Sequence, residues 1–169
     1  MDDVFKEGLG EGRTAWNEAL RGALRKACAD GAREIRCFDK DFAAWPWGEG
    51  ELLDALTGWA HPPRRLTLVA AQFDELQRRQ PRFVTWRQRF DPCFSGLAFE
   101  AQPGDRMSFE SALLAIAPNG DLLSLRLLDS VRWRFAASLQ KHDGVLLQDW
   151  FDVAAQRCEA AFAATTLGL

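Results

Sequence analysis

The stretch that decides the fold is Ala112–Leu128, ALLAIAPNGDLLSLRLL. Two apolar runs flank the tetrapeptide Pro118-Asn119-Gly120-Asp121. Asn-Gly between apolar runs predicts a β-hairpin, because both residues tolerate the positive φ of a tight turn. Neither run alternates between apolar and polar residues, so both strands are expected to be covered on both faces, as in the middle of a layered α/β sheet. The rest of the chain is therefore expected to pack on this hairpin or to pair with it.

Helices and strands alternate along the chain before the hairpin. Apolar residues recur at helical spacing from Thr14, the expected N-cap, to Gly31, the expected left-handed stop. Runs of β-branched and apolar residues alternate with such helices as far as the hairpin, which indicates right-handed βαβ units. Helices are predicted over 14–30, 49–60, 73–80 and 82–90, and strands over 33–38, 64–71 and 97–101.

The two ends of the chain complete this pattern. Residues 1–11 contain Gly8 and Gly10 and are expected to be a flexible lead-in. After the hairpin, Asp129–Asp143 has no clear assignment, Lys141–Gly144 is predicted as a turn, and a long helix is predicted from Val145 to Ala163. No linker is visible, so residues 1–169 are expected to form a single domain. The fold class is α/β, with a mixed, mostly parallel sheet, helices on both faces and a C-terminal antiparallel hairpin.

Composition and targeting signals favour a cytoplasmic protein. The first residues are acidic and lack the apolar core of a signal peptide, and no run reaches the roughly 18 apolar residues that a membrane helix needs. The four cysteines are scattered singly, without a CxxC pair or a Cys/His cluster, so reduced thiols are expected rather than disulfides or a zinc site. These cysteines are Cys28, Cys37, Cys93 and Cys158.

Arginines are concentrated in the middle of the chain. Residues 61–90 hold seven arginines and two acidic residues, whereas the net charge of the whole chain is −3. The Arg78–Arg89 stretch has aromatic residues between its arginines and predicts either an anion or nucleic-acid surface, or an amphipathic helix with a solvated basic face. The helix is favoured, and the acidic net charge argues against nucleic acid. The candidate residues for a small anionic ligand are Arg82, Trp86, Arg87 and Arg89, with Arg132 and Arg134 as a smaller basic group.

Other candidate sites have simpler interpretations. His61 follows a predicted helix and suits its C-terminal dipole, and His142 lies in a predicted solvated turn. Asp39 and Asp41 follow the first strand, where they could hold Mg²⁺, but ordinary loop chemistry explains them better. No phosphate-binding glycine loop or nucleophile elbow is present. No metal and no cofactor is therefore predicted.

The order of elements resembles one half of a phospholipase D superfamily protein, in particular small proteobacterial proteins that carry such a half-domain. The resemblance covers about residues 30–163. It rests on the segments 33–38, 64–69 and 114–121 and on the tail around Trp150-Phe151-Asp152. It implies a phospholipase D-like fold.

The resemblance also implies where a catalytic site would lie. In the superfamily an HxKxxxxD motif leads into this hairpin, its His attacks phosphorus, its Lys binds the phosphate, and two copies meet across a twofold axis. The matching window here, Phe109–Ala115, contains neither His nor Lys, so no catalytic residue is predicted. The expected function is a non-catalytic binding or scaffolding module, paired as a homodimer through the hairpin region. The alternatives are a divergent phosphodiesterase-type enzyme and an anion-binding or nucleic-acid-binding module that uses Arg78–Arg89.

Overall fold

The predicted hairpin stands at the centre of the sheet. Strands β5 (Ser111–Ile116) and β6 (Leu122–Asp129) pair in antiparallel register in the computed structural model, which describes residues 5–105 and 107–164. Every residue of β5 is buried, as expected for a strand covered on both faces. The turn uses one positive φ: Gly120 has φ 93° and donates its N–H to the carbonyl of Ala117 at 2.9 Å. Asn119 instead accepts the N–H of Asp121 through its side chain at 3.0 Å.

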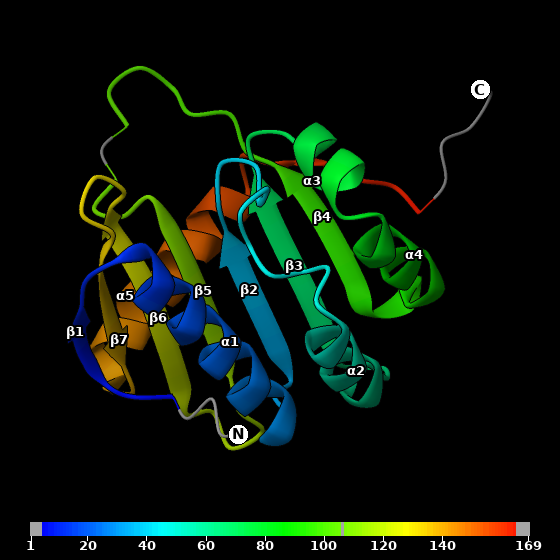
Figure 1. The fold of residues 1–169 in the computed structure, drawn as a ribbon. Coiled ribbons are helices and arrows are strands. Elements are labelled where there is room, and N and C mark those ends of the chain that lie inside the picture. Colours follow the sequence, from blue (N-terminus) through cyan, green and yellow to red (C-terminus); the bar gives the residue numbers. More distant parts are fainter. Residues whose placement is uncertain (1–4, 106, 165–169) are drawn as a thin grey trace.

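Eight strands form one mixed sheet in the order β1-β7-β6-β5-β2-β3-β4-β8 (Figure 1). Among the described residues, parallel pairing is confined to β2, β3 and β4, and the other neighbours are antiparallel. The mixed α/β sheet is confirmed, but the expected predominance of parallel pairing is wrong, because β1, β7 and β8 add antiparallel neighbours. The remaining strands are β1 (Gly8–Gly10), β2 (Glu34–Phe38), β3 (Arg65–Ala70), β4 (Phe94–Ala98), β7 (Arg134–Ser138) and β8 (Glu159–Ala160).

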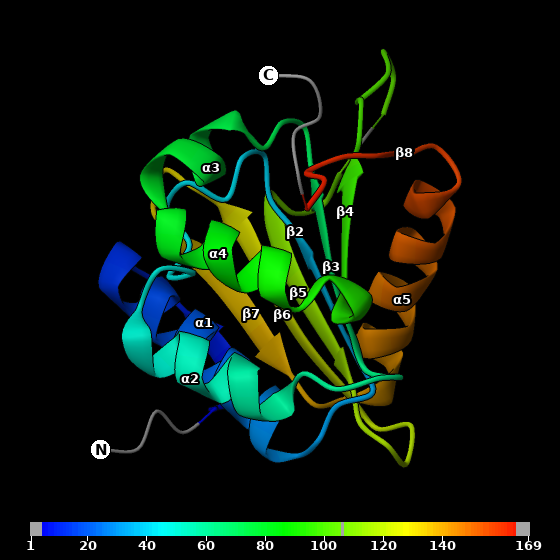
Figure 2. The same ribbon diagram turned by 90° about the vertical axis from the view of Figure 1, so that its right-hand side faces the viewer.

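Helices cover both faces of the sheet, as predicted. Figure 2 shows α1 to α4 on one face and α5 on the other. Two clusters of buried apolar residues fill the layers: the larger one includes Leu24, Leu56 and Phe83, and the smaller one includes Leu147 and Phe151 of α5. Among the described residues, no helix is long and apolar enough to cross a membrane. The helices are α1 (Arg13–Ala29), α2 (Gly50–Trp59), α3 (Asp74–Arg79), α4 (Pro81–Arg89) and α5 (Lys141–Ala155), with a short 3₁₀ turn at Asp91–Cys93.

The N-terminal region differs from the expected flexible lead-in. Its residues 8–10 form the edge strand β1, while residues 1–4 lie outside the described part of the chain. A Cβ on Gly10 would come within 2.1 Å of the Phe135 ring, so a glycine is needed for β1 to lie this close to β7. Thr14 is not the N-cap: α1 begins at Arg13 after Gly12, without a side-chain cap.

The region after the hairpin differs most from prediction. Lys141–Gly144 is not a turn but the start of α5, where Asp143 accepts the hydroxyl of Ser138 at 2.7 Å. The helix ends at Ala155 rather than Ala163. The following segment leaves the helix to form β8, and Phe162 enters the larger core. Strand β4 also begins three residues earlier than predicted.

Candidate functional site

A cavity of about 550 Å³ opens where β2 ends and β5 begins. Its walls come from the start of α1, the loop after β2, the residues before β5 and the turn after β6. Apolar and aromatic side chains predominate, with a few polar groups among them, which is the usual composition of a small-molecule site. The aromatic walls are Trp16, Phe38, Trp45, Phe109 and Trp133, and the polar residues are Asp39, Lys40, Glu110, Ser111 and Ser130.

The partly buried Asp39 and the buried Ser111 form a hydrogen-bonded polar pair in this cavity. The Ser111 hydroxyl donates to Oδ1 of Asp39, and Ser111 is only 3% exposed. The other carboxylate oxygen accepts the N–H of Phe42 at 2.8 Å and that of Asp41 at 3.2 Å. Burial raises the pKa of the Asp39 carboxyl, and the hydrogen bonds from Ser111 and the two backbone N–H groups counteract this only in part. A carboxyl group is thus held at the cavity wall by neutral donors.

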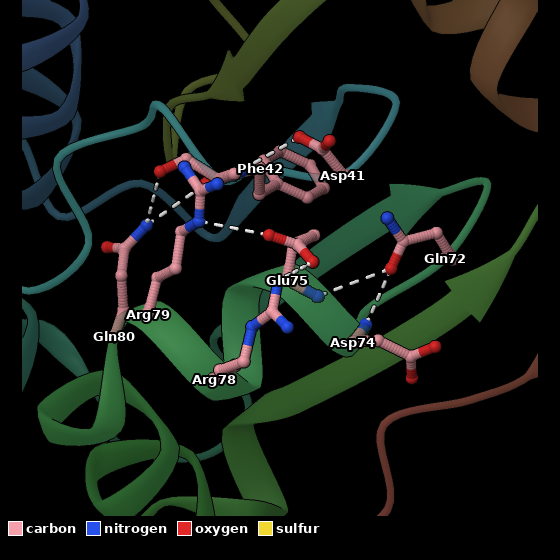
Figure 3. Close-up of polar contacts among 9 residues, drawn as sticks. Asp41, Phe42, Gln72, Asp74, Glu75, Arg78, Arg79 and Gln80 are labelled. Atoms are coloured by element: carbon pink, nitrogen blue, oxygen red, sulfur yellow. Dashed lines mark hydrogen bonds and ion pairs between the residues drawn. The ribbon is translucent and has the colours of Figure 1, made fainter.

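The buried side chain of Gln80 holds the loop after β2 through two hydrogen bonds. Figure 3 shows Gln80, which follows α3, reaching the loop, where its amide nitrogen donates to the carbonyls of Phe42 at 3.1 Å and Ala43 at 3.3 Å. Phe42 has φ 57°, an unfavourable value for a bulky residue. The hydrogen bonds of Gln80 and Asp39 to this residue therefore hold a strained loop in place.

We expect Gln80→Leu to lower the free energy of unfolding by about 2 kcal/mol, because two carbonyls of a strained loop lose their donor. The near-ultraviolet circular dichroism should change as well, since Trp45 and Trp47 lie in this loop and stack at 5.7 Å. Urea denaturation measures the first effect. Gln77→Leu, at an exposed position of α3, is the control and should change neither quantity. Equal effects of the two substitutions would contradict this role of Gln80.

The opposite wall is a turn organised by Asp129. Its carboxylate accepts the N–H of Val131 at 3.1 Å and that of Arg132 at 2.8 Å, and it pairs with the guanidinium of Arg134 at 2.5 Å. The backbone N–H of Arg132 and the Arg134 guanidinium hold the pKa of this carboxyl below its usual value. Trp133 follows with φ 56°, and its ring faces the cavity. Both walls of the cavity thus contain a non-glycine residue in the left-handed region, a kind of strain that often occurs at ligand sites.

The catalytic groups implied by the resemblance are absent from this cavity. The window Phe109–Ala115 contains neither His nor Lys, and the Phe109 ring packs against Trp150 with centroids 5.0 Å apart. His61 is exposed after α2, and His142 is exposed in the first turn of α5. Neither histidine lines the cavity. The described part of the cavity therefore offers no imidazole nucleophile.

The predicted basic residues do not form one site. Arg82 and Arg89 are exposed on α4, whereas Trp86 and Arg87 are buried. Helix α4 packs on β4 through Phe83 and Phe94, and the strand order places four strands between β4 and β7, where Arg134 lies. The smaller basic group, Arg132 and Arg134, belongs to the Asp129 turn. The structure therefore supports the amphipathic-helix interpretation of Arg78–Arg89.

Arg87 has a structural role. Its Nε donates to the carbonyl of Phe162 at 2.7 Å, and its Nη1 pairs with Asp91 at 2.5 Å. Its guanidinium also lies over the rings of Phe94 and Phe162, at 4.5 and 5.6 Å. These contacts leave little of the guanidinium for an external anion, which favours a structural role for Arg87 over the predicted anion site.

Asp41, the four cysteines and a second cavity are the remaining candidates for chemistry. Asp41 accepts the N–H of Ala43 at 3.0 Å, and no cluster of three metal-ligating side chains occurs within residues 5–105 and 107–164. All four cysteines are free, and burial raises the pKa of each, to about 12 for Cys28. A second cavity of about 600 Å³ lies at the opposite end of the sheet, by the hairpin turn. Its charged residues are solvent-facing, and two of them, Lys26 and Asp30, pair with each other at 2.8 Å.

Sequence reasoning identifies part of the cavity. Asp39 stands out because it follows a strand end, and Ser111 because it belongs to the motif window. The contributions of Trp45, Ser130 and Trp133 are not predicted. The alternation of apolar and polar residues over Val131–Phe135 indicates that Trp133 points to one side of the chain, but it cannot show that this side faces the cavity.

Comparisons with known proteins identify the fold. No protein-family model and no curated protein sequence matches the chain. Among solved structures, NucT from Helicobacter pylori, which has a phospholipase D-like fold, matches with a TM-score of 0.58 and 10% identity over 92% of this chain and 99% of NucT. TrmBL2, an archaeal chromatin protein, matches with a TM-score of 0.57 and 11% identity over 92% of this chain. The match covers 55% of the TrmBL2 chain. The fold is therefore phospholipase D-like, as the resemblance implied.

Proposed function

We propose that the chain is a non-catalytic ligand-binding module on a phospholipase D-like fold, and that its ligand occupies the cavity between β2 and β5. The observation that carries this proposal is the cavity itself. It has about 550 Å³ of space, aromatic walls and one hydrogen-bonded polar pair, Asp39–Ser111, and part of the window Phe109–Ala115 lines it. A pocket with these features is suited to binding, and none of the described residues that line it is a histidine.

The alternative of a divergent phosphodiesterase needs a nucleophile and a fixed positive charge. Neither histidine lines the cavity, and the Ser111 hydroxyl donates to the carboxyl group of Asp39, whose pKa is raised by its partial burial. Lys40 is the one cationic side chain among the described residues that line the cavity, and it is exposed. This arrangement favours binding over catalysis.

The alternative of nucleic-acid binding has less support. TrmBL2 binds DNA, in a mode described as novel for that protein. In this chain the net charge is −3, the candidate arginines are dispersed, and Arg87 is buried. Homodimer formation through the hairpin region and a cytoplasmic location remain predictions, and sedimentation velocity would test the first of them.

The cavity can be tested by filling it. We expect fragments detected by ligand-observed NMR to bind the wild-type protein and to lose about tenfold or more in affinity for Ser130→Trp, because residue 130 lines the cavity. Val131→Trp is the matched control, since Val131 is 90% exposed and does not line the cavity. Bis(4-nitrophenyl) phosphate should not be hydrolysed above background. Fragments that bind Ser130→Trp unchanged, or hydrolysis that Ser111→Ala abolishes, would overturn the proposal.

A further inference from the structure

The partly buried carboxyl of Asp39 has no cationic partner among the described residues. Its three hydrogen-bond donors, the Ser111 hydroxyl and the N–H groups of Asp41 and Phe42, are all neutral. Among the described residues, the carboxylate of Asp41 also raises the pKa of Asp39, by like-charge repulsion. Lys40 is adjacent in sequence, but its side chain is exposed and forms no ion pair with Asp39.

A carboxylate that is partly withdrawn from water and has no cationic partner is destabilised, because desolvation disfavours its charge. Proteins neutralise such a group either by protonation, through a raised pKa, or by pairing it with a cation. Here the carboxyl group faces a cavity, so the missing charge can be supplied by whatever enters that cavity. The neutral donors around Asp39 keep the carboxylate in place but do not cancel its charge.

The walls around this carboxylate are suited to a cation that carries an apolar body. Aromatic rings attract cations through their faces. The Trp133 ring already does so on one side, since the guanidinium carbon of Arg13 lies 5.5 Å from its centroid. Trp45 and Phe109 add further apolar wall for a flat group.

Two other ligand classes fit less well. An anion would meet two carboxylates, Asp39 and Glu110, against the single described cation of the lining, Lys40. A divalent metal ion needs several oxygen ligands, and no group of three candidate ligands occurs in the described residues.

We propose that the cavity binds an organic cation, an ammonium group attached to a flat apolar body, with the ammonium against the Asp39 carboxylate and the body against the aromatic walls. This inference rests on the proposed function and adds the charge class of the ligand. It differs from what the phospholipase D resemblance implies, because a phosphate ester is an anion.

Three probes of similar size and different charge test this inference: 2-phenylethylammonium, 2-phenylethanol and 3-phenylpropanoate. We expect the wild-type protein to bind the ammonium about tenfold more tightly than the alcohol, and the carboxylate most weakly, as measured by calorimetric or NMR titration. In Asp39→Asn the preference for the ammonium should fall to about twofold or less while the alcohol still binds. Glu110→Gln is the matched control and should keep most of the preference, because Glu110 is exposed.

A second variant keeps the test decisive if Asp39→Asn unfolds. Ser111→Ala removes a donor that competes for Asp39, so it should raise the affinity for the ammonium and leave that for the alcohol unchanged. Three results would overturn this inference. The wild-type protein could bind the three probes equally, or Asp39→Asn could keep the preference for the ammonium. The third result is displacement of the ammonium by MgCl2 but not by NaCl at equal ionic strength.

Arg106 lies outside the described residues, and Arg106→Ala tests whether this residue supplies the missing charge. A large gain in ammonium affinity in that variant, with no preference in the wild-type protein, would also overturn the inference. After any of these results, the proposed ligand-binding function still holds if neutral fragments bind the wild-type protein and bind Ser130→Trp more weakly. That function fails separately if no fragment of any charge binds.

Discussion

Replacing Gly144 by alanine is expected to lower the free energy of unfolding by about 3 kcal/mol, although alanine is the better helix former. A Cβ at this position of α5 would lie 2.4 Å from the Cβ of Leu122 and 2.7 Å from its Cδ1. Leu122 begins β6 and is itself buried, so it has little room to move. The helix would have to move away from the sheet and would lose packing at Leu147 and Phe151.

Gly58 in α2 provides the control for this prediction. Nothing lies within 4 Å of a Cβ placed there, so Gly58→Ala should stabilise the protein by about 0.5–1 kcal/mol through helix propensity. Urea denaturation of the two variants therefore gives shifts of opposite sign. A Gly144→Ala variant as stable as the wild-type protein would show that α5 does not lie as close to β6 as described.

Replacing Arg87 by methionine is expected to cost about 3 kcal/mol, because the Phe162 carbonyl and the Asp91 carboxylate both lose a buried donor. Methionine keeps the apolar stem, so the loss reports mainly on the guanidinium. The contact with Phe162 holds the segment after α5 against α4. The cost should therefore come with release of that segment.

Limited proteolysis followed by mass spectrometry measures this release at residues 156–164, and urea denaturation measures the change in stability. Arg89→Met is the control on the same helix, since Arg89 is exposed and its guanidinium lies 5.0 Å from the Phe90 ring centroid. That variant should stay within about 0.5 kcal/mol of the wild-type protein. Similar losses in both variants would show that Arg87 does not anchor the C-terminal segment.

The central elements are predictable because their signals are local. The Asn-Gly turn between apolar runs indicates β5 and β6, and helical periodicity indicates α1 and α2 to within a residue or two. The elements that differ from prediction depend on distant residues. Strand β1 is a glycine-rich segment that forms a strand by pairing with β7, and the missing side chain of Gly10 leaves room there for the Phe135 ring. Gly144 resembles a turn residue but is the contact point with Leu122.

In the candidate site, too, residues with a local sequence signal are predictable, and residues that depend on distant contacts are not. Asp39 is recognisable from its place after a strand, but its partner Ser111 lies 72 residues further along the chain. The arginine stretch is a misleading signal, because charge counts do not reveal that Arg87 is buried against Phe94 and Phe162. Burial of a charged side chain depends on tertiary contacts, which hydropathy along one helix cannot show.

The two shortest strands, β1 and β8, are the outermost strands of the sheet. Long unpaired strand edges can recruit other chains and start fibrils, whereas edges of two or three residues offer few backbone groups for such pairing. The long apolar strands β5 and β6, which would aggregate readily if exposed, are separated from both edges by other strands. Trimming either terminal segment should therefore make the chain prone to insoluble assembly before it affects the cavity.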